Sequence, residues 1–198
     1  LLAGIGQGYV LTTPLQLAVM TARLANGGVV VNPHLTRNIV TADGVAPRQA
    51  KEPMDIGLVP GHLALVREAM ETVVNQPTGT AFRSRIRAPE FRMAGKTGTA
   101  QVRRISKLER ENRVLKNDEL PWKERDHALF VGYAPIAAPR YAVSVVIEHG
   151  GGGSRVAAPI ARDVLEEAQR RDAARPGEEI SIEKASGGQG TSTSSVKL

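Results

Sequence analysis

The residues of this chain best suited to chemistry are Lys96, Thr97, Gly98 and Thr99, in a segment that reads as a β-strand over residues 91–102. Side chains alternate along a strand, so Lys96 and Gly98 share one face and the two threonines the other. Both sets serve one cleft only if the strand edge lines it. The lysine then offers a charge for a carboxylate, the threonines offer hydroxyls, and a free backbone N–H can hold an oxyanion. Gly98 leaves room for a substrate that adds as a short strand.

The composition is that of one globular domain with tails. The chain has 198 residues, 23% of them charged, with a net charge of +6 and no cysteine. Disulfides and thiolate metal sites are therefore excluded. No apolar run approaches the ~20 residues of a transmembrane helix. Because the chain begins without methionine and without a signal peptide, we expect it to be a fragment of a longer protein.

We expect neither a metal nor a cofactor. The histidines lack the close spacing of metal ligands, and residues 4–8 lack the glycine spacing of a dinucleotide fingerprint. Asp126 and His127 are adjacent, but neighbouring strand residues point to opposite faces and rarely pair. We therefore expect structural or surface roles for the four histidines, which are His34, His62, His127 and His149.

Two helices are predicted before the Lys96 strand and one near the C-terminus. Thr13, Pro14 and Gln16 fit a capping box with proline in the first turn. The helix they begin should stop at the glycine pair 27–28. Apolar residues at three- and four-residue spacing predict a second helix over 63–75 and a third over 156–168.

The remaining patterns predict an antiparallel sheet flanked by helices, an α/β (α+β) fold. Segments 128–134 and 141–148 are rich in strand formers and are joined by a proline-flanked turn, which predicts a hairpin. The mixed charges of residues 103–126 predict a solvated insertion between strands, and residues 43–60 read as a surface loop. From residue 172 to 198 the chain is polar, which predicts a disordered tail.

A series of short motifs carries a resemblance to a known family. The motifs lie at residues 4–8, 13–16, 25–28, 78–81, 96–101 and 130–135. In this order they resemble the class B penicillin-binding proteins, and Arg-Asp-His at 125–127 and Glu-His-Gly-Gly at 148–151 are most similar to the elongation-type enzyme. The resemblance covers residues 4–171, and an ordered series is more specific than any one motif.

The resemblance implies that residues 1–171 are the C-terminal part of a transpeptidase domain with the penicillin-binding/β-lactamase-like fold. In that family a serine attacks the D-Ala-D-Ala end of a peptidoglycan stem peptide, or a β-lactam, and forms an acyl-enzyme. In the family pattern Lys96 shapes the electrostatics of the site, and Thr97 and Thr99 bind the carboxylate of the substrate or β-lactam. It places Gly98 in the substrate edge and the Thr99 backbone N–H in the oxyanion hole.

The resemblance also implies where the parent protein acts. It would be anchored at the periplasmic face of the bacterial inner membrane and would meet elongation-complex proteins through regions outside this chain. Its substrates and ligands would be stem peptides and β-lactams, without a nucleic-acid partner.

The nucleophile motif Ser-x-x-Lys and the middle motif Ser-x-Asn are missing from their expected upstream places. Ser181 with Lys184 and Ser194 with Lys197 match the first motif literally, but they lie in the polar tail, and we take both as chance. We therefore expect this chain alone to be inactive. The helix over 14–26 has no obvious partner for its full apolar stripe, so we expect self-association or marginal stability.

Two other functions compete with transpeptidation. A net charge of +6 is compatible with a non-catalytic basic module that binds glycan or nucleic acid, although 4% aromatic residues argue against base stacking. A D,D-carboxypeptidase or a β-lactamase would belong to the same superfamily but would hydrolyse its substrate instead of transferring the acyl group to a second peptide. The Gly-Gln-Gly and Thr-Pro-Leu-Gln motifs speak against both hydrolases.

Overall fold

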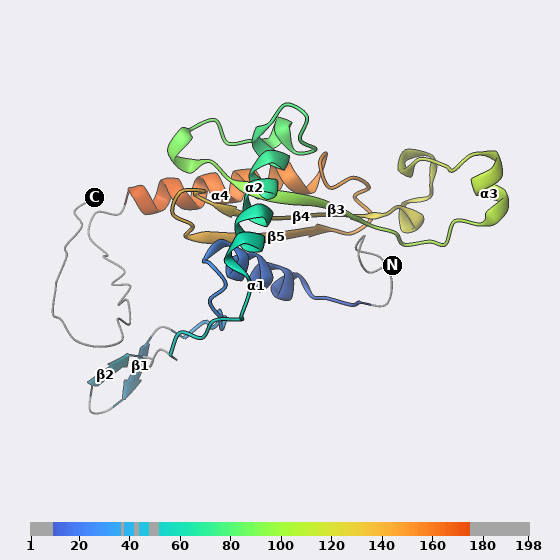
Figure 1. The fold of residues 1–198 in the computed structure, drawn as a ribbon. Coiled ribbons are helices and arrows are strands. Elements are labelled where there is room, and N and C mark those ends of the chain that lie inside the picture. The colour runs from blue at the N-terminus through green and yellow to red at the C-terminus, as the bar shows by residue number, and fades with distance from the viewer. Residues whose placement is uncertain (1–9, 37, 42–43, 48–51, 175–198) are drawn as a thin grey trace.

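A three-stranded antiparallel sheet forms the centre of the computed structural model, in the order β3-β4-β5 (Figure 1). The strands are β3 (Ala94–Ala100), β4 (His127–Ala134) and β5 (Tyr141–Ile147). The structure describes residues 10–36, 38–41, 44–47 and 52–174. The hairpin of β4 and β5 confirms the prediction, and β3 lies at an edge of the described sheet.

The predicted helices are present with small shifts in their bounds. They are α1 (Pro14–Ala25), α2 (Pro60–Asn75) and α4 (Ala157–Ala173). The capping box of α1 is confirmed, because the Thr13 N–H donates to Gln16 Oε1 (2.7 Å) and the Gln16 N–H donates to Thr13 Oγ1 (3.2 Å).

The α4 helix packs on one face of the sheet and builds the larger core cluster. Phe130 is fully buried at its centre. A Cβ added at Gly95 would lie 2.3 Å from Phe130 Cζ, and one added at Gly132 would lie 2.7 Å from Phe130 Cε1. The two glycines therefore make room for the ring. The other buried members of this cluster are Val74, Ala81, Ile86, Met93, Ala128, Ala134, Ala157, Ala158, Ala161 and Leu165.

The opposite face is covered by α1, which contacts β4 and β5, while α2 contacts β3. Met70 of α2 joins Ala25 and Tyr133 in a second buried cluster. The α1 helix thus has a partner in the sheet, but the sheet covers only part of its apolar stripe. Leu15 and Met20 of the same helix remain 60% and 44% exposed.

Three segments differ from the sequence-based expectation. A two-stranded hairpin of β1 (Asn38–Thr41) and β2 (Gly44–Pro47) lies partly inside the stretch predicted to be loop. α2 begins at Pro60, where Val59 is the N-cap without a side-chain cap bond. α4 continues to Ala173, into the segment predicted to be tail, and residues 175–198 lie outside the described residues.

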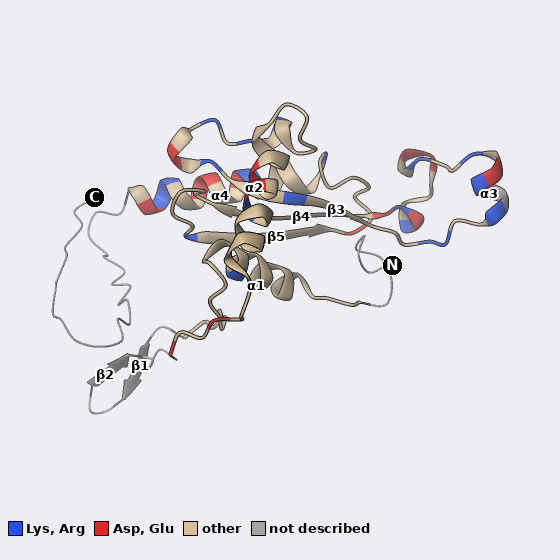
Figure 2. Cartoon of the chain, in the orientation of Figure 1, with Lys and Arg blue, Asp and Glu red and all other residues tan. Residues whose placement is uncertain are grey.

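The charged insertion forms a lobe that extends beyond the end of β3 (Figures 1 and 2). It contains α3 (Lys107–Asn112) and two short 3-10 helices, Asn117–Glu119 and Trp122–Glu124. Elsewhere in the described part of the chain, short 3-10 helices form at Phe82–Ser84 and Pro89–Phe91. None of the helices in the described part of the chain is long and apolar enough to cross a membrane.

Phe130→Ala should lower the free energy of unfolding by about 3–5 kcal/mol, because the ring leaves a cavity that two glycines cannot fill. Urea unfolding of this chain measures the change. Leu65→Ala is the matched control, since Leu65 is 65% exposed on α2 and its removal should cost less than about 0.5 kcal/mol. Equal effects of the two substitutions would contradict the assignment of Phe130 to the core.

Candidate functional site

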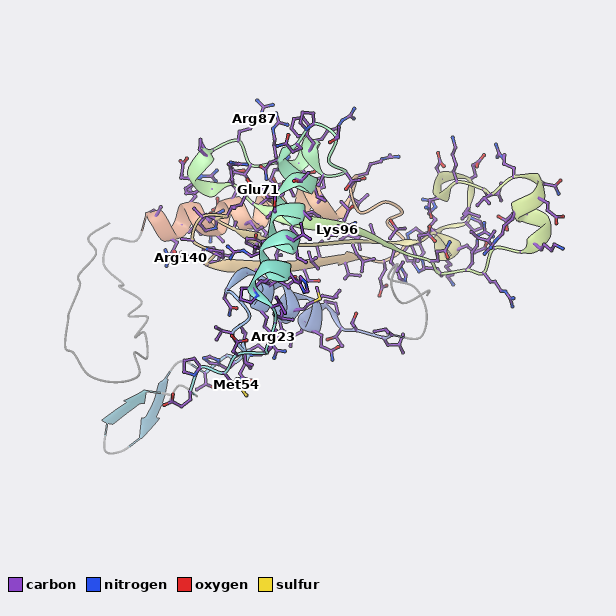
Figure 3. The ribbon with its side chains drawn as sticks, viewed as in Figure 1. Arg23, Met54, Glu71, Arg87, Lys96 and Arg140 are labelled. Carbon is purple, nitrogen blue, oxygen red and sulfur yellow. The ribbon has the colours of Figure 1, made fainter. Side chains whose placement is uncertain are left out.

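Lys96 lies on the open edge strand with its ammonium exposed (Figure 3). Its Nζ donates a hydrogen bond to the Thr97 carbonyl oxygen at 2.8 Å. Among the described residues no carboxylate forms a salt bridge with this lysine. The charge is therefore available to an anion that approaches the edge of β3.

The pairing with β4 confirms the predicted division of side chains between two faces. Lys96 pairs with Val131 and Gly98 with Leu129, whereas Thr97 pairs with the buried Phe130. Backbone groups of alternate residues in an edge strand point outward. The Thr97 carbonyl oxygen accepts a hydrogen bond from the exposed Lys96 ammonium, and the backbone groups of Thr99, two residues on, face the same side of the strand as those of Thr97.

The start of β3 is fixed by the end of α2. Asn75 Nδ2 donates to the Met93 carbonyl at 3.0 Å and to the Glu71 carbonyl at 3.1 Å. Arg92 forms a salt bridge with the Glu71 carboxylate at 2.8 Å. These bonds join the last turn of α2 to the residues that precede the Lys-Thr-Gly segment, so the helix sets where the strand begins.

Thr80 is a site residue that sequence reasoning did not single out. Its Oγ1 is 2.9 Å from Thr97 Oγ1, which places a second hydroxyl beside the edge strand. The turn that carries Thr80 lies tightly on α2, because a Cβ at Gly79 would be 2.2 Å from the Val73 carbonyl oxygen. The Thr-Gly-Thr-Ala motif at 78–81 contains Thr80, but the motif does not indicate that Thr80 contacts Thr97, because the two residues are distant in sequence.

Gly153, at the start of α4, is the second such residue. An added Cβ would lie 2.2 Å from the Leu129 carbonyl oxygen, 2.4 Å from the Gly98 carbonyl oxygen and 3.0 Å from the Gly98 nitrogen. The obstructing atoms are backbone, which cannot rotate away. The loop before α4 therefore rests directly on the middle of the Lys-Thr-Gly strand, and only glycine allows this approach.

The end of the sheet is closed by two histidines. The His149 N–H donates to His127 Nδ1 at 2.9 Å, and His149 Nδ1 is 3.0 Å from the Arg125 carbonyl oxygen. The Trp122 ring lies 4.5 Å from the His149 ring, edge to face. Asp126 instead bonds Asn117. Both histidines thus take part in contacts that join the start of β4 to the turn after β5. The described residues hold no cluster suited to a metal ion.

One ion pair anchors the charged lobe. Arg103 Nη1 donates to Glu109 Oε2 at 2.8 Å, and its Nη2 donates to the other carboxylate oxygen. Both side chains are largely buried, with 20% and 18% exposed. The hydrogen bond from Arg103 lowers the pKa of Glu109 to about 2. The pair ties the end of the β3 extension to α3.

The described residues bring the predicted site residues together on one strand. Lys96, Thr97, Gly98 and Thr99 line one open edge, with the Thr80 hydroxyl beside them. The arrangement can hold a carboxylate and accept an extended chain along the strand edge. The literal Ser-x-x-Lys matches at Ser181 and Ser194, and the motif at residues 4–8, lie outside the described residues.

Comparison with known proteins gives a consistent set of matches. The family model "Penicillin binding protein transpeptidase domain" matches residues 1–166. The chain is 40% identical over 168 residues to a peptidoglycan D,D-transpeptidase MrdA of Haemophilus influenzae, covering 82% of this chain and 24% of that protein. The corresponding protein of Salmonella typhimurium is 35% identical over 165 residues, covering 82% and 26%. The chain thus spans about a quarter of the length of these relatives.

Solved structures agree in fold. PBP2 of Pseudomonas aeruginosa, in complex with WCK 5153, superposes with a TM-score of 0.65 at 37% identity, covering 91% of this chain and 34% of that one. PBP2 of Helicobacter pylori, in complex with MreC, superposes with a TM-score of 0.66 at 27% identity, covering 87% and 27%. These likenesses extend over the sheet and the helices described above.

Gly153→Ala should destabilise the chain by about 1–3 kcal/mol, because a methyl group is forced against fixed backbone. The clash should displace the loop before α4 and so change the chemical shifts of the Gly98 and Leu129 amides. Urea unfolding and heteronuclear NMR measure the two effects. Gly152→Ala is the matched control, since no atom lies within 4 Å of the added Cβ. Unshifted Gly98 and Leu129 amides in Gly153→Ala would show that the loop does not bear on the strand.

Acid should weaken the Arg103–Glu109 pair that anchors the charged lobe. The lowered pKa of Glu109 means that its pair with Arg103 stabilises the fold above the ordinary value of 4.5, and that this contribution is lost as pH falls toward about 2. Arg103→Gln should bring the pKa of Glu109 back toward 4.5, measured by NMR titration of the carboxyl carbon. Arg104→Gln should leave that titration unchanged, and an equal change in both variants would argue against a specific pair.

Proposed function

This chain belongs to the penicillin-binding protein transpeptidase family, and from that membership we propose that it is part of a peptidoglycan D,D-transpeptidase. In the whole protein a serine outside this chain attacks the D-Ala-D-Ala carbonyl of a stem peptide and forms an acyl-enzyme, which a second stem peptide resolves. β-Lactams acylate the same serine. The exposed Lys-Thr-Gly strand is the observation that carries the proposal: its ammonium donates a hydrogen bond to the Thr97 carbonyl but forms no salt bridge among the described residues.

Each residue of this edge receives a separate role. The Lys96 ammonium supplies positive potential where the serine reacts and where the substrate carboxylate lies. The hydroxyls of Thr97 and Thr99 hold that carboxylate. The outward N–H of Thr99 donates to the oxyanion of the tetrahedral intermediate, and Gly98 lets the substrate backbone approach. Thr80 supports this geometry through its 2.9 Å contact with the Thr97 hydroxyl.

The location and partners of the parent follow from the same membership. We propose that it acts at the periplasmic face of the bacterial inner membrane, held there by an anchor outside this chain. Since a structural neighbour is a complex of PBP2 with MreC, elongation-complex proteins are the expected partners, through regions that this chain lacks. The family match favours this function over a non-catalytic basic module and over the hydrolases.

Lys96→Ala in the full-length parent should lower the second-order rate of acylation by benzylpenicillin by on the order of a hundredfold or more, the scale of losing one preorganised electrostatic contact. The fold should change little, because an exposed ammonium typically contributes about 0–1 kcal/mol. Thr99→Ala should do less harm, since its proposed oxyanion donor is a backbone group. Intact-mass kinetics, with melting temperature measured in parallel, follow both.

Arg87→Ala is the control, since Arg87 is an exposed cation at a distance from the Lys96 edge (Figure 3). Its rate of acylation should match that of the wild type. If Lys96→Ala also acylated at the wild-type rate, at matched melting temperature, the lysine would be a solvated strand residue and the proposed role would fail.

A further inference from the structure

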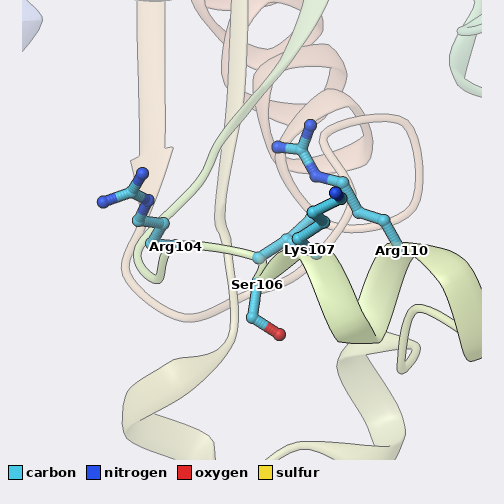
Figure 4. A pocket seen from close by; sticks show the side chains of 5 residues that line it. Arg104, Ser106, Lys107 and Arg110 are labelled. Carbon is cyan, nitrogen blue, oxygen red and sulfur yellow. The ribbon is translucent and has the colours of Figure 1, made fainter.

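A basic pocket lies on the charged lobe, away from the Lys96 edge. It has a volume of about 480 Å³ and is lined by Arg104, Ile105, Ser106, Lys107 and Arg110. Figure 4 shows the ends of the three cationic side chains on one side of the segment and the Ser106 hydroxyl on the other. Three of the five side chains that line this pocket therefore carry positive charge.

The arginines that line the pocket are not those that form the ion pairs of the lobe. Glu109 is engaged by Arg103, and Glu119 pairs with Arg113. Lys107 has only an exposed contact of 3.9 Å with Glu111. In the part of the chain that the structure describes, no carboxylate forms a salt bridge with Arg104 or Arg110. Arg104 and Arg110 line the same pocket, and neither guanidinium is engaged by a carboxylate of the described residues, so both remain available to an external anion.

The pocket lies on the continuation of the substrate edge. β3 ends at Ala100, and the chain runs on through Arg103 into the pocket residues (Figure 1). At about 3.3 Å per residue, an extended chain covers at most ~17 Å between Thr99 and Arg104. A ligand that adds along the edge of β3 and continues in the same direction therefore approaches the pocket, whereas a single β-lactam is too small to reach both places.

We propose that this pocket is a subsite for a free carboxylate of the peptidoglycan strand, beyond the D-Ala-D-Ala end that reacts. The inference rests on the function proposed above and adds a second point of recognition to it. Arg104 and Arg110 bind the carboxylate, and Lys107 adds positive potential. The Arg103–Glu109 pair holds Arg104 and α3 in place, so the subsite is prepared before the substrate arrives.

The test compares a polymeric and a small substrate in the full-length parent. Arg104→Ala combined with Arg110→Ala should lower kcat/KM for cross-linking of pentapeptide-bearing peptidoglycan strands by about tenfold, mainly through KM, and less at high salt. Acylation by benzylpenicillin should remain at the wild-type rate. Replacing both arginines with lysine should restore part of the loss. Lys123→Ala, an exposed cation of the lobe outside the pocket, should change neither reaction.

A second experiment compares native strands with strands whose stem-peptide carboxylates have been amidated. The wild type should lose about as much rate on amidated strands as the double variant loses on native strands, and the double variant should be indifferent to amidation. Unchanged cross-linking by the double variant, or equal effects of amidation on both proteins, would overturn the subsite. Loss of benzylpenicillin acylation together with cross-linking would make the lobe a structural support instead. Failure of the wild type to react with benzylpenicillin would refute the proposed function itself.

Discussion

The position of the edge strand β3 depends on glycines that let neighbouring backbone segments come into direct contact with it. Gly153 rests on Gly98 and on the Leu129 carbonyl from the side of α4, at distances that exclude even a methyl group. Gly95 and Gly132 admit the Phe130 ring into the same layer. Because protein interiors are close-packed, removing side chains at these places lets β3, β4 and the α4 loop approach as one rigid unit. The position of the Lys-Thr-Gly segment follows from that approach.

A rigid support of this kind matters because the proposed chemistry depends on backbone geometry. A hydrogen-bond donor for an oxyanion must already point at the place where charge develops, since reorganising it during the reaction would cost energy. Asn75 fixes the beginning of β3 against α2, and Gly153 fixes its middle against the start of α4. The outer edge stays open to a ligand, while the other edge is paired along its full length with β4.

The charges of the molecule divide into those that hold structure and those that face outward. Arg103 and Arg92 are each bound to a carboxylate, Glu109 and Glu71. Such pairs orient the segments that carry them, as the low pKa of Glu109 reflects. Lys96 has no such partner among the described residues, and the same is true of the pocket arginines. Figure 2 shows that the sheet carries few charges, whereas the lobe beyond β3, which carries the pocket arginines, is densely charged.

Local patterns were sufficient for much of the fold and for the central residues of the candidate site. The Thr13 capping box, the apolar spacing of α2 and the turn between β4 and β5 each depend on residues close in sequence, so their physical meaning could be read directly. The motif series at 78–81, 96–101 and 130–135 could likewise be read directly, because each motif is a short run of adjacent residues, and the family match over residues 1–166 agrees with the resemblance it carries.

Tertiary structure decided the contacts between segments that are distant along the chain. No local pattern indicates that Gly153 meets Gly98 or that Thr80 meets Thr97, since both contacts depend on how α2 and α4 pack on the sheet. The same holds for the charged lobe: its sequence shows alternating signs, but only the folded lobe selects Arg103 as the partner of Glu109 and leaves neighbouring Arg104 free. Pairing is a matter of distance in space, and composition cannot determine it.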